Sequence, residues 1–537
     1  MVFMDFFKSQ KIIFALELLF FSLLAFFIGS PATTSPFYGD LNVIDEGQFA
    51  AWGNFMLHGK QLFKDMYVVY GPLYVYPVYI LFEMFSPSAF LVRCYLIAGS
   101  IVGIIAMNFV MKELKIGILA RYIMNLLLIF LPIMFLRQGM GWISLYLLIL
   151  MATRKKVAYS FLTGLFAALT LLVTPDIGII IGVIIGLYFM YHLFTHSEWR
   201  KISRHLAYWA LGYGIPLILF FIWAGAEGWL QAYLFGTIRQ LIEFSGMNVP
   251  NGQNLPNIFL LMPSGTQFYL GIKFLASEEL LIYYVIALHI VLLSYWTIKI
   301  ILKEFSYNDK KLFPIFLFSI SLLYISLRTP DLGHLFFILS PILLLSIYYL
   351  EKCFVLIKKK SIRIPLKIPY FVIASIILLL FFRLFYLNHP QIIKTLHIPS
   401  AIATTPKNPK YVGPIHISDE QRRYFGNLQN FMENASTPHD KIFIFTDEPM
   451  LYLIVNRDNA TKYVLPFAAV TKTMREDMVN DLKKNRPKYI LINNNAWHID
   501  GISNEKRLPE VVQHIRHNYT KTRVIDGFII YRHNTYE

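Results

Sequence analysis

The chain has 537 residues, of which 56% are apolar and only 15% are charged. An ordinary globular protein carries roughly 25% charged residues, so the composition excludes a soluble enzyme, a disordered chain and a disulfide-stapled fold. The net charge of +16 would favour a nucleic-acid partner in a soluble protein. In a membrane protein this charge is instead expected in the cytoplasmic loops, and we predict no nucleic-acid partner.

Apolar runs recur along the chain at lengths that suit membrane helices. A bilayer core requires about 20 residues of helix, and eleven runs approach or exceed this length. They cover residues 11–29, 88–111, 117–136, 139–152, 157–174, 176–195, 205–225, 280–302, 312–327, 331–350 and 368–388. The sequence therefore predicts an α-helical polytopic membrane protein with about 11 transmembrane helices.

The loops between these runs alternate in charge, which orients the chain. Lysine and arginine are dense in every second loop, from the N-terminal segment to residues 352–367, and sparse in the loops between. Because cytoplasmic loops concentrate basic residues, we expect a cytoplasmic N-terminus. An odd number of spans then places everything after residue 388 on the extracytoplasmic side.

Three external segments are too long to be simple connections: residues 30–87, 226–279 and 389–537. The first two are loops between membrane spans, whereas the third has the length of a small domain. We therefore divide the chain into a transmembrane catalytic domain over residues 1–388 and an extracytoplasmic domain beyond it.

The C-terminal segment has the pattern of a small soluble α/β domain. Residues 441–445, 488–492 and 528–531 read as strands, and residues 471–484 have helical spacing. The strand–helix–strand order favours a partly parallel sheet. The sequence contains neither a G-x-G-x-x-G nor a P-loop motif, so a nucleotide site has no support.

Ionisable residues at the external membrane boundary are the candidates for chemistry, because such groups are costly at membrane depth and often functional. The first external loop opens with Asp45 and Glu46 and continues with Lys64, Asp65 and Tyr70. A carboxylate there can act as a general base toward a hydroxyl group.

A helix is expected directly after Asp45. Its apolar residues fall at helical spacing and predict that it lies on the membrane surface; they are Phe49, Trp52, Phe55 and Met56. Asp45 has two interpretations. It is either the N-cap of this helix, with Gln48 completing a capping box, or a catalytic carboxylate at the membrane edge, and the pattern leaves both open.

Two external turns and a lone arginine complete the candidates. Asp176 follows a proline between two spans, where a simple turn residue is the alternative. Arg328, Asp331 and His334 share one turn, and the alternative there is an Arg–Asp pair that only closes the turn. Arg137 lies in another short loop, where snorkelling is the alternative. Since the planar arginine fork binds two phosphate oxygens, both arginines are candidate phosphate ligands.

Taken together, the motifs resemble the GT-C glycosyltransferases, in the bacterial branch related to protein O-mannosyltransferases and the lipid A aminoarabinose transferase. The resemblance includes the single first span, the loop motifs around Asp45, Asp65 and Pro72, the turn from Arg328 to His334, and the external C-terminal segment. It implies a GT-C-like fold in a bacterial inner membrane.

The resemblance implies transfer of a sugar from a polyprenyl-phosphate carrier to a glycan, lipid or protein acceptor on the extracytoplasmic face, with inversion at the anomeric carbon. Asp45 corresponds to the acidic residue of the first loop that acts toward the acceptor, as general base or orienting group. Glu46 and Asp65 would shape the acceptor site or hold a cation. Tyr70 stands where the aminoarabinose transferases carry a lysine, so neither that substrate nor that lysine's contact with the donor phosphate is predicted here.

The remaining candidates serve the donor. The leaving lipid phosphate gains negative charge, which Arg137, Arg328, Lys64 or a divalent cation would stabilise. Support for the substrate site is assigned to Tyr70 and to three residues of the later turns, Asp176, Asp331 and His334. No other cofactor is predicted, and the sequence does not specify a metal site.

Two other classes are weighed against an enzyme. A transporter or flippase for a lipid-linked or anionic substrate would need polar groups through the membrane depth, which the spans mostly lack. A non-catalytic membrane scaffold would not need several carboxylates on one side. We rank the glycosyltransferase first and the transporter second.

Overall fold

The computed structural model describes residues 10–30, 33–130, 135–195, 199–243, 278–302, 306–327, 332–358, 407–499 and 502–536. The expected span at 368–388 and most of the external segment 226–279 lie outside these ranges, as do Arg328 and Asp331.

Long apolar helices dominate the described chain. Six of them are long and apolar enough to cross a membrane by length and composition: α2 (Gln10–Ile28), α5 (Ala89–Glu113), α9 (Pro175–Thr195), α10 (Trp199–Ala226), α14 (Glu278–Ile301) and α16 (Leu332–Lys358). Shorter or less apolar helices are α4 (Pro72–Phe85), α6 (Ile118–Phe130), α7 (Leu136–Arg154), α8 (Val157–Val173), α11 (Leu230–Glu243) and α15 (Tyr307–Ser326). Each expected span before residue 368 overlaps one of these helices.

Local signals set several helix ends. The Ser88 hydroxyl accepts a hydrogen bond from the Leu91 amide at the start of α5, and Ser306 forms a capping box with Asp309 at the start of α15. Such caps satisfy backbone amides that have no partner within the helix. At the C-terminal end of α7, the backbone of Lys155 adopts a left-handed conformation, which ends the helix.

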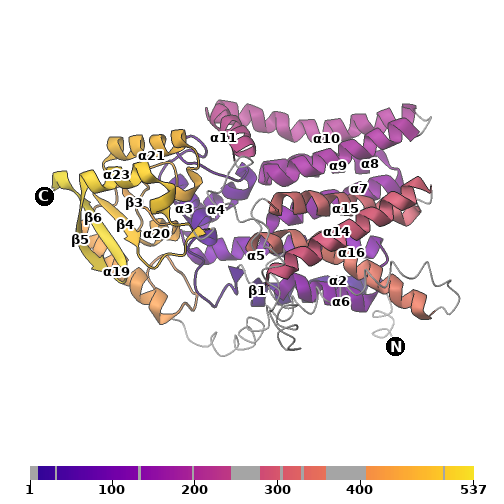
Figure 1. Ribbon diagram of the computed structural model, residues 1–537, viewed down its shortest axis with the longest axis horizontal. Coiled ribbons are helices and arrows are strands. Elements are labelled where there is room, and N and C mark those ends of the chain that lie inside the picture. The colour runs from indigo at the N-terminus through magenta and orange to yellow at the C-terminus, as the bar shows by residue number, and fades with distance from the viewer. Residues whose placement is uncertain are drawn as a thin grey trace, which may run out of the picture.

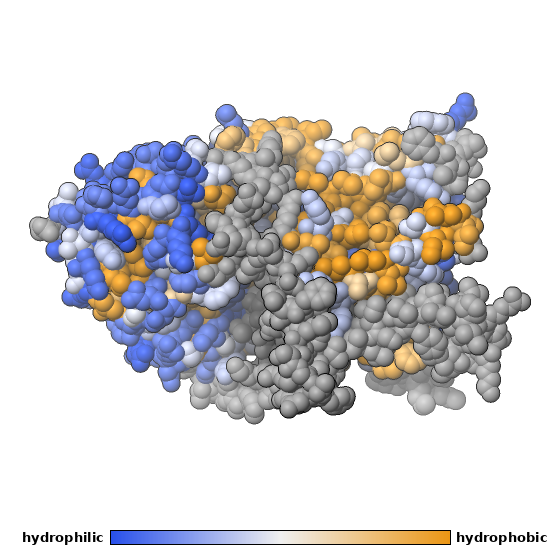
Figure 2. Space-filling model, in the orientation of Figure 1, coloured by the Kyte–Doolittle hydropathy of each residue, from blue (hydrophilic) through white to orange (hydrophobic). Residues whose placement is uncertain are grey.

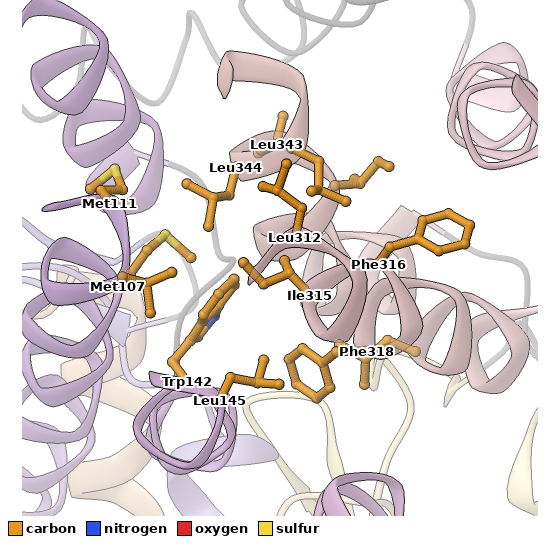
Figure 3. Packing of buried hydrophobic residues seen from close by; sticks show 14 of the residues in the cluster. Met107, Met111, Trp142, Leu145, Leu312, Ile315, Phe316, Phe318, Leu343 and Leu344 are labelled. Atoms are coloured by element: carbon orange, nitrogen blue, oxygen red, sulfur yellow. The ribbon is translucent and has the colours of Figure 1, made fainter. Parts of the chain in front are cut away.

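The helices lie side by side, and a four-stranded sheet lies beyond one end of them (Figure 1). Apolar side chains cover the surface over the helices, while hydrophilic residues cover the C-terminal unit (Figure 2). Inside the bundle, Trp142 of α7 lies near Met107 of α5 and Ile315 of α15 (Figure 3). The Trp142 Nε1 donates to the Ser340 hydroxyl of α16 at 3.1 Å, so even the polar atom of this buried indole is satisfied.

Ion pairs join helix ends at the side of the bundle to which the basic loops belong. Glu113, at the end of α5, binds both Arg154 at the end of α7 and Lys311 in the first turn of α15. Glu17 of α2 binds Arg121 of α6 with both oxygens, at 2.9 and 2.7 Å. These pairs bring together helix ends that the alternation of charge assigns to one membrane face.

The C-terminal unit contains a four-stranded sheet in the order β3-β4-β6-β5. The strands are β3 (Ile442–Ile444), β4 (Tyr489–Asn493), β5 (Tyr519–Ile525) and β6 (Phe528–His533). β3 and β4 are parallel and the other pairs are antiparallel. The helices are α19 (Asp419–Ala435), α20 (Met450–Ile454), α21 (Lys472–Asn485), α22 (Asn504–Arg507) and α23 (Pro509–Asn518). Three of the strands overlap the expected ones, and β5 was not expected.

The first external loop and the C-terminal unit share one hydrophobic core. Helix α3 (Asp45–Leu57) packs against α20, where the Met450 amide donates to the Val43 carbonyl at 3.1 Å. A Cβ on Gly47 would lie 2.4 Å from the Met450 nitrogen, so only glycine allows this approach. The two segments are therefore joined by close packing as well as by the chain.

This packing corrects the expectation that α3 lies on the membrane surface. The four apolar residues that carry the helical spacing, Phe49, Trp52, Phe55 and Met56, are between 1% and 9% exposed. The Phe55 ring meets the Tyr452 ring of α20 at a centroid distance of 5.4 Å. The apolar side chains of α3 therefore face protein.

Candidate active site

Asp45 lies in the first turn of α3 with its side chain exposed. The loop before it is fixed by Asn42, whose Oδ1 accepts from the amides of Ile44 and Asp45 at 3.1 and 2.8 Å. The Asn42 Nδ2 donates to the Asp45 carboxylate at 2.9 Å. The N-cap position belongs to Ile44, without a side-chain cap, so the expected capping box of Asp45 and Gln48 is not formed. Asn42, and not Asp45, therefore accepts the backbone hydrogen bonds at the start of this helix.

Glu46, the next residue, is completely buried and paired with Arg93 of α5. Arg93 Nε and Nη2 donate to the two Glu46 oxygens at 2.8 and 2.9 Å. Arg93 also donates to three backbone carbonyls of the loop before α3, those of Ser35, Gly39 and Asp40. Both Glu46 oxygens are engaged in this pair, which ties the start of α3 to a membrane helix.

Two turns meet at the same end of the bundle. The Gly71 amide donates to the Val173 carbonyl at 3.0 Å, between the turn before α4 and the end of α8. A Cβ on Gly71 would lie only 2.0 Å from the Leu172 carbonyl oxygen, so this approach requires glycine. It brings Tyr70 close to Asp176, which lies in the first turn of α9.

A close packing of α5 and α7 sets the position of Arg137. A Cβ on Gly139 would lie 2.9 Å from Gly103 Cα, and one on Gly99 would lie 2.7 Å from Leu136 Cβ. The two helices therefore touch along small residues at the start of α7. Arg137 is the second residue of that helix and is half-buried.

Four chemical groups come together at these helix starts. Arg137 interacts electrostatically with Tyr70, Asp176 and Asp45. Asp45, Arg137 and Asp176 each lie in the first turn of a different helix: α3, α7 and α9. The Thr174 hydroxyl donates to the Asp176 carboxylate. The cluster thus unites two carboxylates and a guanidinium at helix N-termini, and in it the Arg137 guanidinium and the positive ends of the helix dipoles are the groups that favour an anion.

Tyr70 interacts with each of the three charged groups of this cluster, Arg137, Asp45 and Asp176. Burial raises the pKa of its phenol above the ordinary value, and the Arg137 guanidinium opposes that shift. The Tyr70 ring stacks on Phe49 at a centroid distance of 5.6 Å and meets Tyr74 edge-on at 5.0 Å. Its phenol also bonds the side chain of Gln48. Tyr70 therefore stays protonated near neutral pH and can take part in hydrogen bonds.

Lys64 and Asp65 occupy an exposed turn of the same loop. The Asp65 carboxylate accepts from the Gln61 amide at 2.8 Å, and Lys64 Nζ donates to Gln61 Oε1 at 3.0 Å. Phe63, just before Lys64, contacts the rings of Trp229, in the turn between α10 and α11, and Tyr233 of α11. Both charged residues thus bond within their own turn.

Other expected site residues are only partly covered by the structure. Arg328 and Asp331 lie outside the described residues, and of His334 only its backbone in α16 is described. Within the described ranges, no group of three or more His, Cys, Asp or Glu side chains is placed to hold a metal ion. Sequence reasoning missed Gln48 as the partner of Tyr70, although a polar residue on an apolar helix was a signal that it has a specific partner.

Comparisons with known proteins give structural neighbours only. No family model and no curated protein matches the chain. ArnT from Cupriavidus metallidurans bound to undecaprenyl phosphate has 10% identity and a TM-score of 0.46, with 97% of each chain covered. Its apo structure has 12% identity and a TM-score of 0.43, with 98% of each chain covered.

A third neighbour is the arabinofuranosyltransferase AftD from Mycobacteria, with 12% identity and a TM-score of 0.43. The match covers 98% of this chain and 40% of that one.

Proposed function

We propose that the chain is an integral-membrane glycosyltransferase that moves a sugar from a polyprenyl-phosphate carrier to an acceptor on the extracytoplasmic face. The observation that carries the proposal is the grouping of Asp45, Arg137, Asp176 and Tyr70 at the ends of apolar helices. It combines a base and an anion-binding group beside apolar helices. A lipid-linked sugar phosphate needs all of these.

Asp45 is the proposed general base. Its carboxylate is exposed, so an acceptor hydroxyl can approach it. As the hydroxyl oxygen bonds to the anomeric carbon, Asp45 takes the hydroxyl proton. The bond between that carbon and the phosphate oxygen breaks on the opposite side, and the phosphate leaves with the electron pair. Because the hydroxyl attacks the face opposite the leaving phosphate, the configuration of the anomeric carbon is inverted.

Arg137 is the proposed ligand of the donor phosphate. A planar guanidinium can bond two phosphate oxygens, and the start of α7 adds the positive end of a helix dipole. Asp176, bonded to Thr174, orients Arg137, and Tyr70 donates to the donor or to the leaving phosphate. We retain Arg328 and Lys64 as further phosphate ligands, and Asp331, His334 and Asp65 as support for the substrate site. A divalent cation is retained as an alternative source of positive charge.

Glu46 has a positioning role in this proposal. Because both of its oxygens bind Arg93, it fixes the backbone that carries Asp45. This role is proposed without contact with the acceptor, whereas the resemblance implies that Glu46 shapes the acceptor site or holds a cation.

The apolar surface of the helices suits the carrier. Exposed aliphatic side chains cover the outer helices, including Leu219 and Ile222 of α10 at 63% and 65% exposure, and the polyprenyl tail stays in the lipid that they contact. The N-terminus is then cytoplasmic and the C-terminal unit extracytoplasmic, in a bacterial inner membrane. We expect the polar C-terminal unit to face the acceptor.

The test is Asp45→Asn, with release of labelled sugar from polyprenyl-phosphate donors measured on the purified protein in detergent. Loss of the base is expected to reduce transfer by a factor of about 10²–10⁴. Asp419→Asn is the matched control, because that carboxylate is 96% exposed and pairs only locally with Arg422. Transfer by Asp45→Asn at the wild-type rate would remove Asp45 from the mechanism.

A further inference from the structure

A cavity of about 190 Å³ lies in the C-terminal unit, away from the cluster around Tyr70. Thr446 and Asp447, just beyond β3, line one side, and Asn493 and Asn494, at the end of β4, line another. Since β3 and β4 are parallel, the cavity lies at their carboxyl ends. Ligands of α/β sheets commonly bind at this edge.

The lining of this β3–β4 pocket is polar, and its ionisable side chains are those of Asp447, Glu505 and His498. Amide side chains of Asn493, Asn494 and Asn504 contribute to it together with the Asp447 carboxyl group. Amides donate and accept hydrogen bonds at once, which suits a ligand rich in hydroxyl groups. No lysine or arginine stands among the described lining residues, so a phosphate or other anion would lack a countercharge.

Asp447 is fixed in a form suited to a neutral ligand. Its Oδ1 accepts from the Phe467 amide at 3.0 Å, and its Oδ2 accepts from Asn504 Nδ2 at 2.9 Å. Burial raises the pKa of this carboxyl to about 7. The neighbouring Glu448 is bonded to Thr446 and Asn493, each at 2.8 Å. This network holds the pocket wall in place before a ligand arrives.

An exposed tryptophan stands at the pocket. Trp497 lines the cavity, and its side chain is 70% exposed, which is unusual for so large an apolar group. A flat indole beside hydrogen-bonding amides matches a sugar ring, which has an apolar C–H face and a polar hydroxyl edge. Neither an apolar lipid nor an anion has both properties.

The pocket loop also leads directly to the proposed active site. Three residues after Asp447, the amide of Met450 donates to the carbonyl of Val43, two residues before Asp45. Gly47 of α3 lies against the same methionine. A ligand in the pocket is thus held by the segment that packs beside the proposed base.

We propose that the β3–β4 pocket binds a neutral saccharide unit of the acceptor through Trp497, Asn494 and the Asp447 edge. The identification of this saccharide as part of the acceptor rests on the proposed function. The binding of a saccharide in the pocket does not. The acceptor is then a glycan, held by one sugar in the C-terminal unit while another presents its hydroxyl to Asp45.

The experiment is binding of the full-length protein, purified in detergent, to an array of immobilised hexose, N-acetylhexosamine and pentose oligosaccharides, without donor. The wild type is expected to bind a defined subset. Trp497→Ala and Asn494→Ala, both at exposed positions, are expected to weaken that binding about tenfold, since loss of stacking on an aromatic side chain has an effect of that order. Tyr536→Ala, at another exposed aromatic residue of the unit, is the matched control and should bind like the wild type.

Absence of oligosaccharide binding by the wild type, or equal binding by the wild type and both pocket variants, would overturn the inference. Asp45→Asn separates the two proposals, because it should bind the array normally while losing transfer. Normal array binding with no transfer by the wild type would refute the proposed function and leave the pocket supported. Transfer whose acceptor KM is unchanged by Trp497→Ala would refute the pocket as an acceptor site and leave the function intact.

Discussion

Arg93 and Glu46 form a bidentate ion pair buried between α5 and the start of α3, with side chains 0% and 1% exposed. The guanidinium also holds three carbonyls of the preceding loop. A membrane helix thus fixes the segment that carries Asp45, one residue before Glu46. Removing one partner of such a buried pair strongly destabilises the fold, because the other charge is left uncompensated.

Glu46→Gln is therefore expected to destabilise the protein by about 3–5 kcal/mol, measured as a fall in the apparent melting temperature in detergent. Removing both charges, in Glu46→Gln combined with Arg93→Gln, should restore part of that loss. An unchanged melting temperature for the single variant would show that the pair contributes no net stability.

Gly71→Ala tests the contact between the two turns. Its Cβ would lie 2.0 Å from the Leu172 oxygen, so the turn must shift and displace Tyr70. Misplacement by about 1 Å can reduce an enzymatic rate about 100-fold, and we expect a loss of that order in sugar transfer. Gly426→Ala on α19, where a Cβ meets open space, should leave transfer unchanged; equal rates in both variants would contradict the prediction.

Arg137→Gln is expected to lower kcat/KM for the donor by about 100-fold, as loss of one charge-stabilising donor does elsewhere. Arg137→Lys should recover only part of this, since lysine lacks the planar fork. Initial rates against donor concentration provide the measurement. Arg154→Gln, at the opposite end of α7 and 56% exposed, serves as the control, and wild-type kinetics in Arg137→Gln would exclude it as the phosphate ligand.

Asp447 gives the C-terminal unit a pH-dependent stability. Its folded pKa of about 7 exceeds the ordinary 3.8, so between these values the folded state keeps a proton that the unfolded chain has released. Its contribution is complete below about pH 4 and is lost as the pH rises through about 7. The apparent melting temperature should therefore fall more steeply from about pH 5 to pH 8 in the wild type than in Asp447→Asn. Identical slopes would contradict this assignment.

The sequence predicts the membrane helices well, because the length of an apolar run is enough to identify them. The apolar runs are long enough that α2, α5 and the later bundle helices follow from hydropathy alone. Asp45, Arg137 and Asp176 were candidates because charge is scarce at that boundary. Their grouping depends on which helix ends meet, and the close glycine contacts that decide this, such as Gly71 on Leu172, leave no periodic signal.

Other features could not be predicted, for physical reasons. Periodic apolar residues on α3 are compatible with a lipid surface and with a protein surface. The pattern therefore could not predict that Trp52 packs against protein. Asn42, three residues before Asp45, accepts hydrogen bonds from the amides of Ile44 and Asp45. Asn42 therefore forms the side-chain bonds at this helix start that were expected of Asp45 as a cap. β5 is an edge strand whose residues from Thr520 to Val524 are exposed, and its polar composition does not resemble that of a buried strand.

The shared core of α3 and the C-terminal unit has a consequence for biosynthesis. His58, just after α3, bonds Asp458 across 400 residues of chain, so the first external loop emerges long before the unit that completes its core. Until that unit has been translated, the apolar residues of α3 lack the partners that the shared core places against them, and Asp45 stands on an unsupported segment. The proposed activity would thereby depend on completion of the chain, because a truncated protein would form its helices without the packing that supports Asp45.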